Sequence, residues 1–200
     1  MKDIMTTTPI LLKGADLFTP EALLAGASVL VADGRIQAVH ERTDDPNERP
    51  PGTQVIDLKG LKLTPGLIDL HFQGALGHDV WEDDPGAMRA ISSGLVRFGV
   101  TGFLCTSSFR VGGWFNGLID MLDDASAQPG AQPLGLYLES PFVSLAKRGG
   151  IPQDVITPPS VEHLEEIIKL SRGHLRIMTI APELPNILDI IDVLLSLIHI

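Results

Sequence analysis

The spacing of apolar and polar positions changes once along the chain, at residues 64–66. Before this point, four short β-rich segments alternate with turns, and Asp33-Gly34 is predicted to form a tight hairpin turn between the second and the third. A charged, proline-rich stretch, 40–53, is predicted to be a solvated loop. The predicted strands are 10–12, 27–32, 35–39 and 54–58. This first part is therefore interpreted as a small antiparallel β unit.

After residue 66, apolar strands alternate with helical patterns, which is typical of βα units around a parallel sheet. The helix predicted at 160–171 has the clearest start, because Ser160 is a good N-cap and Glu162 places negative charge in the first turn. The predicted strands are 67–72, 102–106, 134–139 and 175–181, and the predicted helices are 85–97, 113–124 and 160–171. Four such units make half a barrel or a small open sheet.

Length limits the choice between these two folds. The 138 residues after position 62 are too few for a closed (β/α)₈ barrel, which typically needs about 250. Residues 195–200 read as the translation of a transposon mosaic-end adapter, although an ordinary apolar helix end is the alternative. We therefore expect an incomplete chain with a β-sandwich portion at 1–62, the first half of a barrel at 63–194 and an adapter-derived tail at 195–200.

The composition excludes some classes of partner and indicates the cellular compartment. The formal net charge is −10 and the sequence has no Lys/Arg cluster, so neither nucleic acid nor an anionic membrane surface is an expected partner. The most apolar stretch, 187–200, is interrupted by Asp189 and Asp192 and is too short to span a bilayer. Cys105 is the only cysteine, which excludes an intramolecular disulfide and a multi-cysteine zinc site. A reducing, cytoplasmic setting is expected.

Candidate chemistry lies where the predicted barrel strands end, since such side chains point into the cleft at the carboxyl face. The two-residue period of a strand places Asp69, His71 and Gln73 on one side. Glu139 ends an otherwise apolar strand, where a carboxylate needs an ionic partner or a metal. Imidazole and carboxylate from separate strands are suitable ligands for zinc or a similar ion. The alternative is a hydrogen-bonded core histidine and a salt-bridged glutamate, and the spacing alone does not decide between them.

Several motifs resemble a known family. The segment 64–71, Thr-Pro-Gly-Leu-Ile-Asp-Leu-His, resembles the first barrel strand of the amidohydrolase superfamily, and 31–36 resembles the β-hairpin that precedes it. The segments 136–142, 146–150 and 178–183 narrow the resemblance to the N-acetylglucosamine-6-phosphate deacetylase family. The resemblance runs from about residue 10 to 183, and the motifs occur in the family's order.

The resemblance implies roles for four residues. Glu139 matches the metal-binding glutamate of the family. His71 and Gln73 occupy two positions that are His-x-His in members with two metals and Gln-x-Asn in members with one, so we expect one tightly held divalent ion, zinc or similar, and leave a second ion open. A carboxamide is a poor zinc ligand, which makes Gln73 the weaker candidate. The main-chain N–H of Gly150 is a candidate substrate donor, although the family commonly has Gly-Ala-His where this chain has Gly-Gly-Ile.

The implied fold is a (β/α)₈ metal-dependent hydrolase barrel, here the first half, with a small N-terminal β-sandwich domain. The implied reaction is deacetylation of N-acetylglucosamine 6-phosphate to glucosamine 6-phosphate and acetate, with a homodimer as the full-length form. The family's remaining metal histidines and its catalytic aspartate lie beyond residue 200, so we expect no catalytic residue in this chain and no activity from it alone. Two alternatives stay open: an N-acetylgalactosamine-6-phosphate deacetylase or other amidohydrolase, and a non-enzymatic sugar-binding or structural α/β protein.

Overall fold

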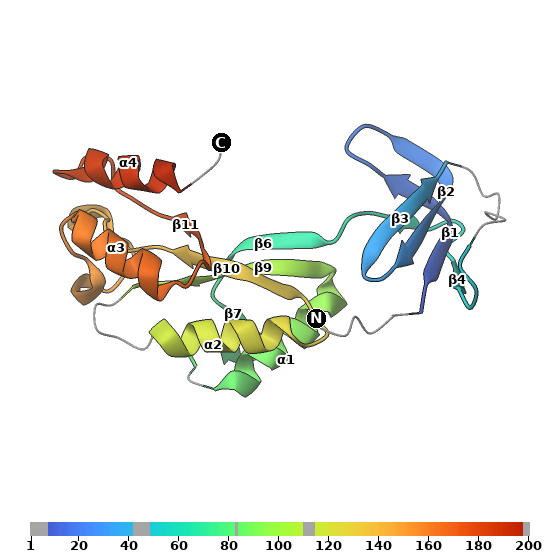
Figure 1. The fold of residues 1–200 in the computed structure, drawn as a ribbon, viewed down its shortest axis with the longest axis horizontal. Helices are drawn as coiled ribbons and strands as arrows, with labels where there is room; N and C mark the ends of the chain where they lie inside the picture. Colours follow the sequence, from blue (N-terminus) through green and yellow to red (C-terminus); the bar gives the residue numbers. More distant parts are fainter. Residues whose placement is uncertain (1–7, 42–48, 83, 110–114, 198–200) are drawn as a thin grey trace. The chain divides into compact units, whose positions relative to one another are not determined.

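The computed structural model describes residues 8–41, 49–82, 84–109 and 115–197, and it divides the chain into two compact units. The first unit is Met1–Pro65 and the second is Gly66–Ile200. Figure 1 labels their helices and strands. Of the tail predicted at 195–200, the last three residues lie outside the described part, and Leu195 and Ser196 form the last turn of a helix.

The first unit contains one five-stranded mixed sheet with the order β3-β2-β1-β4, and β5 also pairs with β1. The prediction of a purely antiparallel unit is wrong, because β4 and β5 run parallel to β1. The connection between β3 and β4 brings the chain back beside β1 in the same direction. The described residues of this unit form a single sheet, so the second layer of a sandwich is not among them. The strands are β1 (Ile10–Phe18), β2 (Leu23–Ala32), β3 (Arg35–His40), β4 (Gln54–Asp57) and β5 (Lys62–Leu63).

The predicted hairpin turn is confirmed. Asp33 and Gly34 have φ angles of 51° and 68°, so both central residues are in the left-handed region that a two-residue hairpin of the common type requires. Inside the sheet, Leu17, Ala27 and Val29 form a small buried cluster. The turn residues and the alternating apolar positions therefore specify the β2–β3 pair locally.

The second unit is built on a four-stranded parallel sheet with the order β11-β10-β9-β6, so strands that follow one another in sequence are neighbours. This order is the one that the first four strands of a (β/α)₈ barrel have, and it confirms the predicted βα units. The strands are β6 (Leu67–Phe72), β9 (Val100–Ser107), β10 (Gln132–Leu138) and β11 (Leu175–Met178), and the helices are α1 (Pro85–Leu95), α2 (Phe115–Ser126), α3 (Val161–Leu170) and α4 (Ile187–Ser196).

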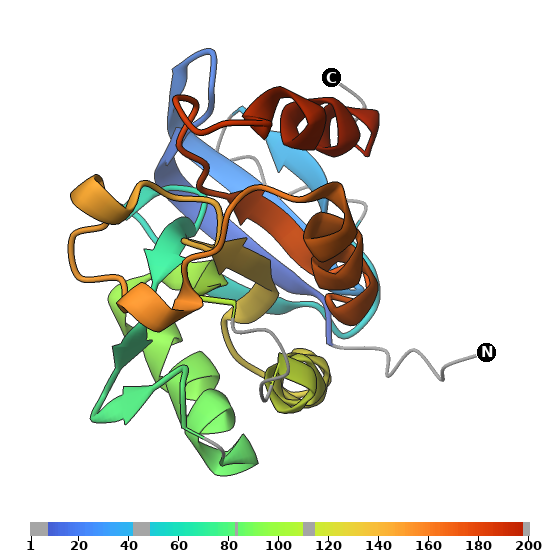
Figure 2. The ribbon, with the colours of Figure 1, turned by 90° about the vertical axis from the view of Figure 1, so that its left-hand side faces the viewer.

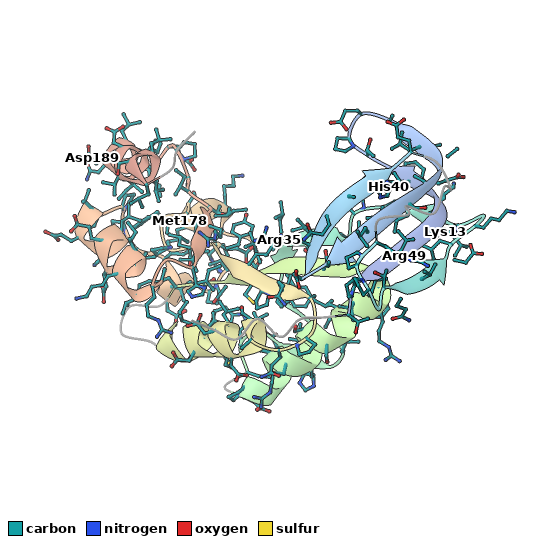
Figure 3. All side chains as sticks on the ribbon, turned by 45° about the vertical axis from the view of Figure 1, so that its right-hand side comes forward. Lys13, Arg35, His40, Arg49, Met178 and Asp189 are labelled. Carbon is teal, nitrogen blue, oxygen red and sulfur yellow. The ribbon has the colours of Figure 1, made fainter. Side chains whose placement is uncertain are left out.

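Most predicted elements of this unit differ from the observed ones by one or two residues at an end, and two differences are larger. The fourth strand ends at Met178 rather than at residue 181, and α4 was not predicted as a separate helix. Figure 3 labels Met178 at the end of β11 and the exposed Asp189, which places negative charge in the first turn of α4. Short elements also join the predicted ones: the hairpin β7 (Gly74–Ala75) and β8 (His78–Asp79), and the 3-10 helices η1 (Val96–Phe98), η2 (Leu145–Lys147) and η3 (Gln153–Val155).

Helices α1 and α3 start within one residue of their predicted starts, while the predicted start of α2, residue 113, lies outside the described residues. The helices cover the sheet with their apolar sides. The Ser160 hydroxyl accepts a hydrogen bond from the His163 N–H at 3.4 Å, which caps α3 as expected. Helices α1 and α2 lie side by side along one side of the sheet, and α3 and α4 lie next to one another (Figures 1 and 2). In the part of the chain that is described, we find no helix with the length and apolarity needed to cross a bilayer.

Strand β6 forms one edge of the parallel sheet and keeps apolar side chains in contact with solvent. Leu67, Ile68 and Leu70 are 63%, 58% and 54% exposed. Strands of a parallel sheet are normally covered on both faces, which explains why this strand carries so many apolar residues. In the described residues, that cover is incomplete at β6.

Cys105 on β9 provides a test of the packing. The side chain is fully buried, and burial raises the pKa of its thiol to about 12. We expect a thiol reagent at pH 8 to label Cys105 slowly in native buffer and quickly in urea, because labelling then requires local opening. The unfolded chain loses the thiol proton above the ordinary pKa of 9.0 while the folded chain keeps it, so the free energy of unfolding should fall as the pH rises from 9 toward 12. Equal labelling rates in both buffers would contradict this packing.

Candidate metal-binding site

An open cavity of about 650 Å³ lies at the carboxyl ends of β6, β9 and β10. Its lining combines the strand ends with the loops that follow them, which is where barrels of this kind place their chemistry. The lining includes the four residues to which the family resemblance gives a role, but not Asp69. The full set is His71, Gln73, Asp79, Trp81, Ser108, Glu139, Arg148, Gly149, Gly150, Ile151 and Pro152.

Glu139 is the centre of the polar contacts in this cavity. His71 Nε2 lies 3.0 Å from Glu139 Oε1, and Gln73 Nε2 donates a hydrogen bond to Glu139 Oε2 at 2.9 Å. The Glu139 side chain is 23% exposed, whereas the His71 side chain is 56% exposed. The fold therefore brings Glu139 into contact with two side chains, His71 and Gln73, that lie 66 or more positions earlier in the sequence.

His71 reaches Glu139 because strand β6 is irregular where it ends. The pairing of β6 with β9 shifts register between Asp69 and Phe72. Asp69 Oδ1 accepts the His71 N–H at 3.1 Å, and the hydroxyl of Thr106 accepts the Phe72 N–H at 3.0 Å. Two backbone donors are thus satisfied by side chains instead of the strand ladder, and such irregularities re-aim side chains next to functional sites.

Small side chains on β9 leave room for this contact. Strand β9 lies between β6 and β10 in the sheet, so His71 must reach across it to meet Glu139. Thr106 is the register partner of Tyr137, and register partners point to the same face of a sheet. Thr106 and the cavity-lining Ser108 are both small.

The Thr106 contact yields a second test. Replacing Thr106 with Val keeps the shape but leaves the buried Phe72 N–H without its acceptor, which we expect to destabilise the second unit by about 1–3 kcal/mol. Amide exchange at Phe72, followed by NMR, should accelerate. Thr101→Val is the matched control, because the Thr101 hydroxyl is exposed and lies 3.4 Å from its acceptor, the Leu67 carbonyl oxygen. The same acceleration in both variants would contradict a specific role for Thr106.

The loop after β10 forms one wall of the cavity. Gly150 is exposed in this loop. Among the described residues, no hydrogen bond from the Gly150 N–H is found, so this predicted donor is available to a ligand. Arg148 also lines the cavity, but its guanidinium donates to the Ile151 carbonyl oxygen at 2.7 Å. That bond holds the loop in shape and keeps the basic side chain beside the cavity.

Asp79 and Trp81 line another wall of the cavity and were not singled out in the sequence. Both follow the first barrel strand, and that position is the signal that was available. Glu82 fixes this wall by accepting the Asp79 N–H at 2.8 Å and by pairing with His78 Nδ1 at 3.2 Å. These two hydrogen bonds hold the pKa of the Glu82 carboxyl below its ordinary value of 4.5.

The donor set fits a divalent cation as part of a site. Glu139 offers a carboxylate and His71 an imidazole, and zinc takes both, while Gln73 offers only a weak carboxamide oxygen. No group of three His, Cys, Asp or Glu side chains with metal-binding geometry occurs in ranges 8–41, 49–82, 84–109 and 115–197. The described residues therefore supply two good ligands, one fewer than a catalytic zinc site takes from its protein.

A second cavity, of about 420 Å³, has a different character. It is lined by apolar and proline residues from loops 143–159 and 184–186, with Gln153, Thr157 and Asn186 as its polar members. It has no pair of groups that suits metal or acid–base chemistry. The cavity around Glu139 is therefore the candidate site.

Comparisons with known proteins show what the chain is similar to. No protein-family model matches the chain. N-acetylglucosamine-6-phosphate deacetylase of Bacillus subtilis is 30% identical over 179 residues, which is 87% of this chain and 44% of that protein. N-acetylgalactosamine-6-phosphate deacetylase of Escherichia coli O157:H7 is 28% identical over 174 residues, which is 86% of this chain and 44% of that protein. The chain thus spans less than half the length of these relatives.

Solved structures show the same fold. The crystal structure of N-acetylglucosamine-6-phosphate deacetylase from Pasteurella multocida superimposes with a TM-score of 0.77 at 24% identity, over 94% of this chain and 48% of that one. Its likeness supports the partial barrel described above. In sequence and in fold, the chain is therefore similar to N-acetylglucosamine-6-phosphate deacetylases over most of its own length and over less than half of theirs.

Proposed function

We propose that the protein containing this chain is a metal-dependent hydrolase that removes the acetyl group from N-acetylglucosamine 6-phosphate and releases acetate. The observation that carries the proposal is the convergence of His71 and Gln73 on Glu139 at the carboxyl end of a half-barrel. The relatives' names supply the substrate class. The cavity of about 650 Å³ has the size of a small-molecule site.

Each residue has a separate task in this proposal. Glu139 and His71 hold a divalent ion, zinc or similar, and Gln73 orients the Glu139 carboxylate through its 2.9 Å hydrogen bond. The ion, when bound, lowers the pKa of a water molecule and polarises the amide carbonyl. The Gly150 N–H is a donor for the substrate. An acid–base group for the leaving amine comes from outside this chain, so we expect the 200 residues alone to be inactive.

The partners follow from the same proposal. A small amino-sugar phosphate is the ligand, and the full-length protein is a cytoplasmic homodimer that binds neither nucleic acid nor membrane. The phosphate-bearing ring lies in the cavity between the loop that carries Gly150 and the loop that carries Trp81. Both loops follow barrel strands, where a ligand above the metal would meet them.

The decisive experiment uses the open reading frame that contains these residues, expressed in full. Acetate release is measured with N-acetylglucosamine 6-phosphate and with its galacto epimer, and bound metal is measured by elemental analysis. We expect turnover of the gluco compound and bound divalent metal. A strong preference for the galacto epimer would support the second candidate function, which the Escherichia coli relative favours. A protein that binds no metal and hydrolyses neither compound would overturn the proposal in favour of a non-enzymatic role.

A further inference from the structure

We propose that Tyr137 is a positioning residue that orients the His71 imidazole toward Glu139, and that Thr179 holds Tyr137 in place. The inference rests on the proposed function, because it assigns His71 to a metal. It adds two residues that are not part of the cavity lining and are not proposed as ligands of the ion. It concerns how an exposed histidine on an edge strand is held ready to bind.

The rings of His71 and Tyr137 are in contact. Their centroids are 5.3 Å apart, with an interplanar angle of 53°. Tyr137 and Glu139 are two positions apart on and directly after β10, so their side chains emerge on the same side of the strand. His71 therefore meets the aromatic ring and the carboxylate of the same strand end at once. A tilted contact at this separation is favourable for two aromatic rings.

Tyr137 is itself fixed from the next strand. Its hydroxyl lies 2.9 Å from the Thr179 hydroxyl, and Thr179 directly follows β11. The Thr179 N–H donates to the Leu138 carbonyl oxygen at 2.8 Å, which anchors the threonine to β10. The contacts thus run without a break from Thr179 through Tyr137 and His71 to Glu139, and then to Gln73.

His71 needs such support because more than half of its side chain is exposed. An exposed side chain samples several rotamers, and fixing one of them on binding an ion lowers the affinity. The Tyr137 ring closes one side of the space open to the imidazole. Groups that orient a metal ligand from behind typically contribute about 10–100-fold to metal affinity.

The expected effects separate the ring from the hydroxyl. Tyr137→Leu removes the ring and should weaken zinc binding by about 10-fold or more. Tyr137→Phe and Thr179→Val keep an aromatic ring beside His71 and should weaken it by less than about 10-fold, because only the outer contact is lost. Phe98→Leu is the matched control, since Phe98 is 66% exposed on η1, at the amino-terminal end of β9.

The experiment has a metal-free part and a metal part. Tyr137 is the only tyrosine among these 200 residues, so tyrosine-specific isotope labelling of the 200-residue chain gives one set of ring signals. We expect nuclear Overhauser contacts from that ring to the His71 imidazole, assigned with His71→Gln. The His71 signals should be strongly broadened or averaged in Tyr137→Leu and broadened to a smaller extent in Thr179→Val. Zinc affinity is then measured on the full open reading frame by competition with a chromophoric chelator, using Glu139→Gln as the variant without a site.

The outcomes distinguish the two proposals. If the wild type binds zinc, Glu139→Gln does not, and Tyr137→Leu binds as tightly as the wild type, the positioning role is overturned and the metal site stands. If the wild type binds no zinc, the proposed function fails, and the His71 signals alone then decide whether Tyr137 orders the imidazole. Cys105 labelling reports whether Tyr137→Leu is folded. Should that variant unfold, an unchanged His71 spectrum and zinc affinity in Thr179→Val would overturn the role of the Thr179 contact.

Discussion

Replacing Glu139 with Gln should reduce the zinc affinity of the full-length protein by at least about 100-fold and its deacetylase activity to a similar extent. The Glu139 carboxylate contacts both His71 and Gln73, so the whole candidate site depends on this group. Losing a residue that only orients a ligand already lowers affinity by about 10–100-fold, and Glu139 is proposed as a ligand itself. Elemental analysis and acetate release measure the two effects.

The fold should survive this substitution. The His71 partner is 56% exposed, and a solvent-exposed ion pair contributes at most about 1 kcal/mol. Glu165→Gln is the matched control, because it removes the same charge from an exposed position on α3. Equal metal content in wild type, Glu139→Gln and Glu165→Gln would show that Glu139 is an ordinary salt-bridged strand end.

Replacing Gly135 with Ala should destabilise the second unit by about 3 kcal/mol or more. Gly135 lies inside β10 with a φ of 136°, a backbone conformation that side-chain-bearing residues rarely adopt. A Cβ there would lie 2.3 Å from the His174 carbonyl oxygen, which is backbone and accepts the Leu136 N–H. Relief requires β10 and the start of β11 to separate, and strain combined with overpacking of this kind exceeds 1–3 kcal/mol.

Thiol labelling of Cys105 measures this loss without assuming a two-state transition. Cys105 is the register partner of Leu136, next to the substituted residue, so its exposure follows opening of β10. A loss of about 3 kcal/mol should raise the labelling rate by about 100-fold when opening precedes reaction. Gly150→Ala is the control, because Gly150 has open space around its Cβ position and no left-handed φ. Similar labelling rates in the two variants would contradict the structural role of Gly135.

Local sequence patterns predicted the barrel elements closely. Strand β6 occupies the predicted residues 67–72, and α3 begins after the predicted cap at Ser160. Both elements are specified by residues close together in the sequence. Strand β6 is a continuous apolar run between turn residues, and α3 follows a serine hydroxyl that precedes a helical repeat. The direction of β4 could not be predicted in this way, because parallel pairing with β1 depends on the path of a connection of about a dozen residues.

The sequence by itself identified the candidate residues, since His71, Gln73 and Glu139 lie at the ends of apolar strands. It also determined the half-barrel, because the alternation of strands and helices is a local pattern. Only the tertiary structure decided that His71 lies 3.0 Å from Glu139 across an intervening strand. That contact depends on the register shift in β6, on the small residues of β9 and on the ring of Tyr137. None of these is encoded in spacing along the chain, because each arises from side chains that meet across different strands.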